Sequence, residues 1–164
     1  MKGWSACVAT WFAVAPAVAV DMAAIPTIGM ELARDLTQGA IEVCRDYGWQ
    51  VSVVVVSKSG DIQAALRDTL APRHTLELAR RKAEAVILSG VSTADLRANR
   101  PEIAMELGNV DSLLLIEGGV PIQYAGVTIG ALAVAGAPGP RNNERCALLS
   151  LAKHQERLDF PEDF

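Results

Sequence analysis

The sequence of 164 residues has few of the residue types that usually build a catalytic or metal site. Aromatic residues make up 5%, and there are only two histidines and three cysteines. No two cysteines have the CxxC spacing of a zinc site, and no GxSxG or HExxH motif occurs. These absences argue against a structural zinc site and against the common signatures of serine hydrolases and zinc proteases.

Runs of positive charge are also scarce. The formal net charge is −4 and the sequence pI is about 5.2. The only basic triplet, residues 80–82, is typical of a solvated helix face. Nucleic-acid binding usually needs a wider basic surface, so we expect no nucleic-acid partner.

Apolar residues are abundant, at 51%, and they are concentrated at the N-terminus. Lys2 is followed by an apolar stretch to residue 20, and Ala17-Val18-Ala19 fits the small-x-small pattern of a signal-peptidase site. We predict that residues 1–19 are a cleaved export signal and that residues 20–164 form one periplasmic or secreted domain. The alternative is a buried first helix or strand. Since the stretch is short for a bilayer, we expect no membrane span in the mature chain.

The cysteines do not settle the redox chemistry. Cys7 lies in the predicted signal, which leaves Cys44 and Cys146 far apart in the sequence. In an oxidising compartment these two could pair. We favour the other interpretation, that they are two small buried hydrophobic residues.

Hydrophobic periodicity and turn residues predict an α+β domain. Two hairpins dominate the strand pattern, so the sheet should be mostly antiparallel with helices packed on it. The predicted elements are a helix at 30–47, strands at 49–57 and 62–67, a helix from about Pro72 to Leu88, short helices from Ser92 or Thr93 and from Pro101, strands at 112–117, 120–124 and 127–135, and a last helix capped by Asn142 or Asn143.

His74 lies near the start of the predicted helix at 72–88. At 100° per residue Leu76, Ala79 and Ala83 share one face, and His74 lies on roughly the opposite side, outside the core. The positive end of the helix disfavours the imidazolium form, and neutral imidazole is the form that ligates metals. From these residues alone an ordinary exposed histidine is favoured over a ligand. Arginines near the helix start could pair with carboxylates of a ligand: Arg67, Arg73 and Arg81.

The other polar candidates are interpreted as surface residues. His154 is surrounded by polar residues in the last helix and has a weaker case for ligation. Asp61, Asp68, Glu77 and Glu117 are isolated in sequence and are more typical of turns, caps and surfaces than of general acids or bases.

Four segments together resemble one family, the GlcG/HbpS-like haem-binding proteins, also known as DUF336 and as the C-terminal domain of PduO-type proteins. Their order and spacing carry the resemblance, which spans residues 30–158. The segments are VVVVSKSGDIQAALRD (53–68), APRHTLELARRKA (71–83), LGNVD (107–111) and GGVPIQYAGVTIGALAVAGAPG (118–139).

The resemblance implies a profilin-like three-layer α/β/α sandwich around a five-stranded antiparallel sheet, and self-association into a homo-oligomer. It also implies haem as the ligand, because members of the family bind haem, and some are exported and linked to haem sensing or degradation. By this resemblance His74 is the candidate axial ligand to the haem iron. The candidate partners of the haem propionates are Arg67, Arg73, Arg81 and Lys82.

The sequence departs from the family pattern in places, most clearly at Glu84, where the family usually has an aromatic residue. An alternative function is therefore a small enzyme or accessory subunit that acts on an organic acid or aldehyde in an oxidation pathway. In it, the turn at 118–121 and Arg67 would line one pocket. A third possibility is a purely structural accessory subunit that binds a partner protein and no ligand.

Overall fold

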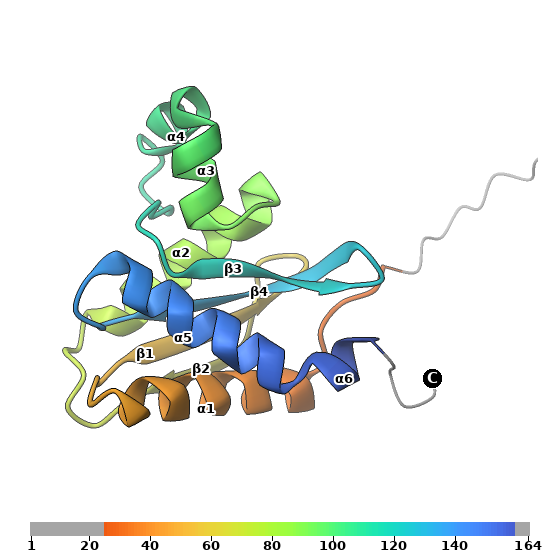
Figure 1. Cartoon of the computed structure of the whole chain (residues 1–164). Coiled ribbons are helices and arrows are strands. Elements are labelled where there is room, and N and C mark those ends of the chain that lie inside the picture. The colour runs from red at the N-terminus through yellow and green to blue at the C-terminus, as the bar shows by residue number, and fades with distance from the viewer. Residues whose placement is uncertain (1–24, 160–164) are drawn as a thin grey trace, which may run out of the picture.

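The computed structural model describes residues 25–159, so the predicted export signal lies outside the described residues. No helix in this part of the chain is long and apolar enough to cross a membrane. The elements follow the predicted order closely (Figure 1). They are α1 (Met30–Asp46), β1 (Ser52–Ser57), β2 (Ile62–Arg67), α2 (Thr75–Ser89), α3 (Thr93–Asn99), α4 (Pro101–Leu107), β3 (Gly119–Tyr124), β4 (Val127–Ala135), α5 (Pro140–Lys153) and α6 (Gln155–Asp159).

The strands of residues 25–159 form one antiparallel sheet in the spatial order β2-β1-β4-β3. Two hairpins, β1–β2 and β3–β4, are joined through the β1–β4 pair. In the β3–β4 turn Ala125 and Gly126 have φ values of 47° and 77°. A two-residue hairpin turn of this hand requires positive φ at both positions. The predictions of both hairpins and of an antiparallel α+β fold are confirmed.

The prediction of a strand at 112–117 is wrong, and within the described residues the sheet has four strands rather than the five that the resemblance implied. The backbone of this segment bonds to a helix instead of a strand. Leu114 N donates to Arg81 O of α2 at 3.2 Å, and Arg81 Nη2 donates to Leu113 O at 2.9 Å. A short apolar run does not distinguish these outcomes by its periodicity.

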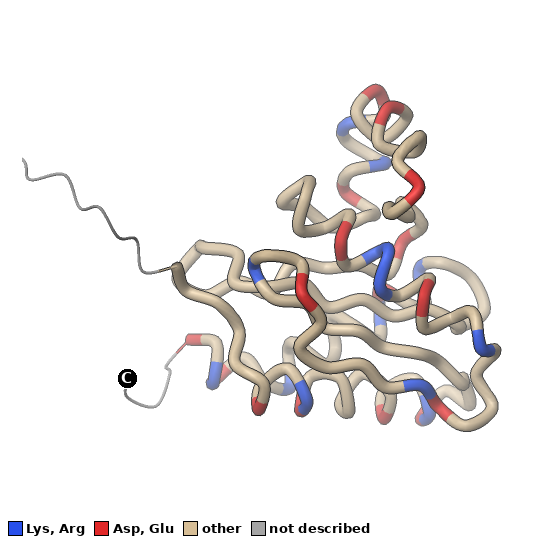
Figure 2. The backbone as a smooth tube through the Cα atoms, turned by 180° about the vertical axis from the view of Figure 1, so that it is seen from behind, with Lys and Arg blue, Asp and Glu red and all other residues tan. Residues whose placement is uncertain are grey.

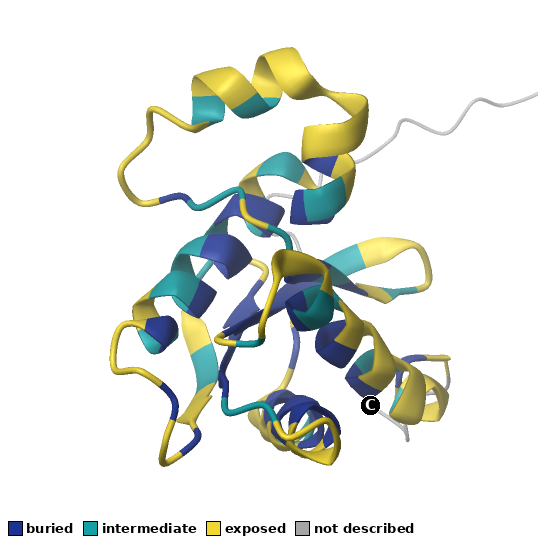
Figure 3. Ribbon diagram, turned by 60° about the vertical axis from the view of Figure 1, so that its left-hand side comes forward, coloured by how far each residue is buried: buried dark blue, intermediate teal, exposed yellow. Residues whose placement is uncertain are grey.

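Helices enclose the sheet on both faces. Helices α1 and α5 pack on one face and α2 on the other (Figure 1). Alternation along β1 sends Val53 and Val55 toward α1 and α5, and Val54 and Val56 toward α2. Figure 3 shows β1, most of β4 and the inward faces of these helices as buried, whereas the edge strand β2 is mostly exposed.

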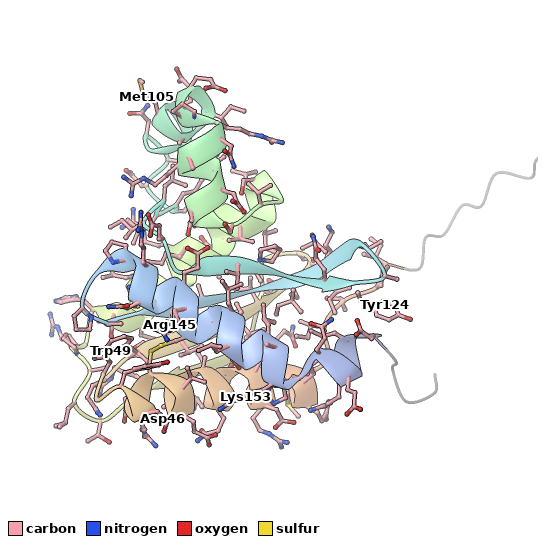
Figure 4. All side chains as sticks on the ribbon, viewed as in Figure 1. Asp46, Trp49, Met105, Tyr124, Arg145 and Lys153 are labelled. Atoms are coloured by element: carbon pink, nitrogen blue, oxygen red, sulfur yellow. A yellow bond between two sulfur atoms is a disulfide. The ribbon has the colours of Figure 1, made fainter. Side chains whose placement is uncertain are left out.

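A disulfide joins the two helices that share a face. Cys44 of α1 and Cys146 of α5 are bonded, with their Cα atoms 5.6 Å apart (Figure 4). The interpretation of the two as unpaired residues is therefore wrong, although both are fully buried as expected. Residues 102 positions apart meet because α1 and α5 lie side by side.

The start of the last helix also differs from the prediction. Helix α5 begins at Pro140 with Gly139 at its N-cap, so the prediction of Asn142 or Asn143 as the cap is wrong. Proline suits the first helical position because its φ is already helical and it has no N–H to leave unpaired. Asn143 is buried and its Oδ1 accepts a hydrogen bond from Ala137 N at 3.0 Å, so it holds the preceding loop.

Helices α3 and α4 project from the sandwich beside the β3 edge (Figures 1 and 3). Their predicted starts are confirmed: Ser92 caps α3 by accepting from Asp95 N at 3.0 Å, and Pro101 begins α4. Helix α4 contains no buried residue. The projection is therefore held to the domain mainly through α3.

Candidate functional site

The start of α2 is fixed by a turn that follows β2. Asp68 is 4% exposed and accepts two hydrogen bonds of 2.7 Å from Arg45 of α1. This guanidinium holds the pKa of the Asp68 carboxyl below its usual range. Thr75 Oγ1 donates to Pro72 O at 2.7 Å, and the helix begins at Thr75 rather than at Pro72. His74 is therefore at the N-cap position and not in the first turn.

His74 is exposed, as the helical periodicity predicted. Its Nε2 accepts a hydrogen bond of 3.3 Å from Nε of the neighbouring Arg73, which is also exposed. The imidazole therefore lies at the surface beside a guanidinium. A cation and a metal-ligating nitrogen are thus adjacent at this point.

The sheet brings Arg67 to the same end of the molecule. Arg67, the last residue of β2, pairs in register with Ser52 of β1. Ser52 Oγ is hydrogen-bonded to Thr75 Oγ1 at 2.7 Å, so the end of β2 and the start of α2 meet here. Arg67 Nη1 donates to Ala71 O at 2.7 Å in the intervening turn. We call the exposed residues Arg67, Arg73 and His74 the histidine surface.

The other two sequence candidates on α2 bond to backbone. Lys82 is only 3% exposed, and its Nζ donates to Glu117 O at 3.0 Å and Val134 O at 2.9 Å. Burial lowers the pKa of Lys82 to about 8. Arg81 bonds to Leu113 O through Nη2, and its buried Nε has no hydrogen-bond partner among residues 25–159. For both residues, contact with a ligand stays a prediction.

A cleft that the sequence did not predict separates α3 from α5. Its volume is about 550 Å³. The half-buried Glu144 lies in it, and burial raises the pKa of that carboxyl, assisted by the charges of Glu117 and Asp95. We call this the α3–α5 cleft; it is lined by Ala94, Asp95, Ala98, Glu117, Arg141, Glu144, Arg145, Leu148 and Leu149.

Two further expectations change with the structure. His154 is half-buried rather than on the surface: its Nδ1 lies 2.8 Å from Ser150 O, and its ring packs over Gly39 of α1. The turn at 118–121 and Arg67 do not share a pocket. They belong to the two edge strands, three strand positions apart, or roughly 14 Å at the usual strand spacing.

The described residues do not form a complete metal-binding site by themselves. Within residues 25–159 no group of three or more histidine, cysteine, aspartate or glutamate side chains is close enough to hold a metal ion. Any metal at the histidine surface would thus need most of its ligands from another molecule. Haem meets that requirement because its porphyrin supplies four nitrogens.

Comparison with known proteins identifies the family. The model of the family described as "Haem degrading protein HbpS-like" matches residues 28–152. This chain belongs to the HbpS-like family, which confirms the resemblance seen in the sequence. Among curated proteins no sequence matches the chain.

Solved structures share the fold. A double mutant of HbpS from Streptomyces reticuli is 29% identical over 86% of this chain and 97% of its own, with a TM-score of 0.76. ORFY from Klebsiella pneumoniae, a DUF336 protein, is 19% identical over 83% and 98%, with a TM-score of 0.72. PduOC, solved as a complex with haem, is 22% identical over 77% and 94%, with a TM-score of 0.68.

Proposed function

We propose that this protein binds haem at the histidine surface, with His74 as an axial ligand to the iron. The observation that carries the proposal is the exposed His74 bonded to Arg73, with the exposed Arg67 at the same end of the domain, in a chain of the HbpS-like family. The family description names haem degradation, and PduOC was solved with haem bound. Both support haem as the ligand here, in a role in haem or iron sensing, transport or degradation.

The chemistry of these residues suits haem. Imidazole nitrogen is a common axial ligand of haem iron, and guanidinium groups pair well with carboxylates such as the propionates. Bound haem would supply a redox-active iron. Iron at His74 Nε2 would replace the hydrogen bond from Arg73 Nε and leave that guanidinium for a propionate. Lys82 fits a propionate contact poorly because its ammonium is buried and holds two backbone carbonyls.

We also propose that the protein is exported and self-associates. The pattern of residues 1–19 supports export, and so does the Cys44–Cys146 disulfide, because such bonds persist in oxidising compartments. Expression of the full chain in an exporting bacterium should yield a mature protein beginning at Val20. An intact-mass measurement that finds residues 1–19 retained in the exported fraction would refute cleavage.

A hemin titration followed at the Soret band tests the haem site. We expect saturable binding, and we expect His74→Ala to shift the Soret maximum and weaken affinity by about tenfold or more, or about 1.4 kcal/mol. His154→Gln, at the only other histidine, is the matched control and should bind as the wild type does. Arg73→Ala should weaken binding about three- to tenfold, since an exposed ion pair contributes about 1 kcal/mol, whereas Arg97→Ala should not.

The outcomes of the titration distinguish haem binding by the protein from the assignment of His74 as the ligand. Absence of saturable hemin binding by the wild type would refute haem binding. Saturable binding that His74→Ala leaves unchanged, in both affinity and Soret position, would refute His74 as the ligand and leave haem binding in place.

A further inference from the structure

A pocket lies at the end of the domain opposite the histidine surface, between the segment that leads into α1, the β3–β4 hairpin and α6. Its volume is about 300 Å³, and we call it the α1–α6 pocket. Arg67 of the histidine surface pairs with Ser52 at the start of β1. Ser57 at the other end of β1 pairs with Gly130, which follows Ile129 of the pocket wall. The strand between these ends is roughly 17 Å long, so the two sites are separate.

The walls of the α1–α6 pocket are aliphatic. Ile28, Ile129 and Leu158 are 2%, 7% and 4% exposed and come from three separate parts of the chain. Leu32 of α1 continues this wall, and Ile25 is 67% exposed at the same pocket. Figure 2 shows no charged position along the segment that leads into α1. A concave aliphatic surface with a few polar groups is typical of small-molecule sites.

Three polar side chains line the pocket, and two of them have donors to spare. Thr27 is already engaged, because its Oγ1 accepts from Lys58 N at 3.3 Å and lies 3.5 Å from Ile129 O. Tyr124 is at the end of β3, in the part of the molecule that also contains α6 (Figure 4). Arg157 is 45% exposed and donates from Nη1 to Asp35 Oδ2 at 2.7 Å. Within residues 25–159 its Nε and Nη2 form no hydrogen bond, and neither does the Tyr124 hydroxyl.

The charges around Arg157 are balanced, so recognition of an anion depends on directed donors. Asp35 serves two guanidiniums, since its Oδ1 accepts from Arg34 at 3.0 and 2.8 Å and its Oδ2 accepts from Arg157. The Glu31 carboxylate lies nearby, 3.7 Å from where a Cβ on Gly29 would be. These two acids offset the two arginines. What remains is the unbonded edge of the Arg157 guanidinium, which faces no lining carboxylate.

That edge is suited to a carboxylate. Nε and Nη2 lie on one side of a guanidinium and bind both oxygens of a carboxylate at once. Arg45 in this chain uses the same two nitrogens on Asp68, at 2.7 Å each. Arginine cannot accept a hydrogen bond, so the polar end of a ligand at Arg157 must be an acceptor.

We propose that the α1–α6 pocket binds a medium-chain aliphatic carboxylate, with its chain among Leu32, Ile129 and Leu158 and its carboxylate at Arg157. The aliphatic walls select the chain, and the free guanidinium edge selects the acid. A volume of about 300 Å³ is at the small end for ligand sites and suits one flexible chain better than a large planar ligand. The inference goes beyond haem binding and does not depend on it.

Titration of the purified protein with octanoate, followed by heteronuclear NMR, tests this site. We expect saturable binding that shifts the backbone amides of Ile28, Leu32 and Ile129. Arg157→Gln should weaken octanoate binding about three- to tenfold, since a half-exposed ion pair is partly screened by water. Asp35→Asn should strengthen binding about twofold, because it removes the carboxylate that competes for Arg157 and keeps an oxygen for Nη1.

Octanol is the matched neutral ligand, and Arg97→Gln is the matched variant on α3. Octanol has the same chain without the charge, so Arg157→Gln should change its affinity little. Arg97→Gln should bind octanoate as the wild type does. Leu32→Trp places a larger side chain in the pocket and should prevent binding of both ligands. Circular dichroism establishes that each variant is folded, and the two charge variants decide the question if Leu32→Trp is not.

The outcomes distinguish the ligand from its position. Absence of saturable octanoate binding by the wild type would overturn the carboxylate site and leave the pocket to a different occupant, such as the chain's own terminal residues. Octanoate affinity that neither Arg157→Gln nor Asp35→Asn changes, or amide shifts confined to residues outside the pocket, would overturn the placement at Arg157. A hemin titration of the same variants should give the wild-type result in every case.

Discussion

The two faces of the sheet are built from different side chains. The face toward α1 and α5 buries large aliphatic residues such as Leu36, Leu132 and Ile122 around the Cys44–Cys146 disulfide. The face toward α2 is mostly alanine and valine, with Ala131, Ala133 and Ala135 along β4 facing Ala79 and Ala83 on the helix. The larger apolar core therefore lies on the disulfide side.

Small residues on the second face let α2 approach the sheet closely. A Cβ added at Gly119 would lie 2.9 Å from Lys82 O, so no side chain fits between that strand and the helix. The close approach also encloses the Lys82 ammonium, which bonds to backbone instead of water. The comparison indicates that large apolar side chains are concentrated on the α1/α5 face, whereas the buried Lys82 ammonium lies on the α2 side.

Of the changes considered, loss of the Cys44–Cys146 disulfide on the α1/α5 face should lower the free energy of unfolding most. We expect Cys44→Ala combined with Cys146→Ala to lower the free energy of unfolding by about 3–5 kcal/mol, because a loop with a sequence separation of 102 is no longer closed in the unfolded chain. Urea unfolding of both proteins measures the difference. Reduction should destabilise the wild type to a similar degree and leave the variant unchanged. A loss below about 1 kcal/mol would show that the α1/α5 face does not depend on the bond.

The α2 face should respond to alkaline pH through Lys82. Burial lowers its pKa from the ordinary 10.5 to about 8, so between these values the unfolded chain binds the proton more tightly than the folded one. The free energy of unfolding should therefore rise with pH across this window, by up to about 3 kcal/mol. Below about pH 8 the cost of burying the charge is fully present. A neutral amine still has two N–H groups for Glu117 O and Val134 O.

The Lys82→Met variant isolates this effect because it keeps the apolar stem and lacks the titrating group. We expect the stability of the wild type relative to Lys82→Met to increase from pH 8 to 10.5 in parallel chemical-denaturation series. A difference that does not change with pH would mean that Lys82 is no harder to charge in the folded protein than in water.

The smallest expected effect on stability concerns the loop before β3, in which Glu117 O accepts a hydrogen bond from Lys82. Gly118 and Gly90 both have positive φ, 127° and 73°, so alanine is strained at both. Only at Gly118 would the new Cβ clash, at 2.7 Å from both Asn143 Cβ and Val134 O; Gly90 has open space. We expect Gly118→Ala to destabilise the protein by about 2 kcal/mol more than Gly90→Ala, measured by thermal or urea unfolding. Equal losses would show that the loop can move away from β4.

Much of the fold could be predicted because its signals are local. Helical periodicity with Gly48 after it predicted α1, and the Ala125-Gly126 pair predicted the β3–β4 turn. The prediction of a strand at 112–117 failed because periodicity does not show which partner the backbone of a short apolar run will bond to. Here the partner is Arg81 of α2. The predicted start of α5 was wrong because an asparagine that could cap a helix is a weaker signal than a proline, whose φ is already helical.

The candidate site was predicted in part. Periodicity correctly placed His74 outside the core, but its N-cap position and its contact with Arg73 needed the turn at 68–74. Lys82 was predicted as a propionate partner, although it is three residues after Ala79 and next to Ala83, which indicates the buried side of the helix. Glu144 had no sequence signal, because its raised pKa comes from a cleft between helices distant in sequence.

The sequence by itself determined the family, the hairpins and the exposure of His74, because these depend on residue order and on periodicities of two and 3.6. Only the tertiary structure decided which cysteines pair, where the Lys82 ammonium lies and which surfaces remain uncovered. The physical reason is that each of these depends on how closely separate elements approach one another. That distance is set by the packed volume of side chains from several elements at once.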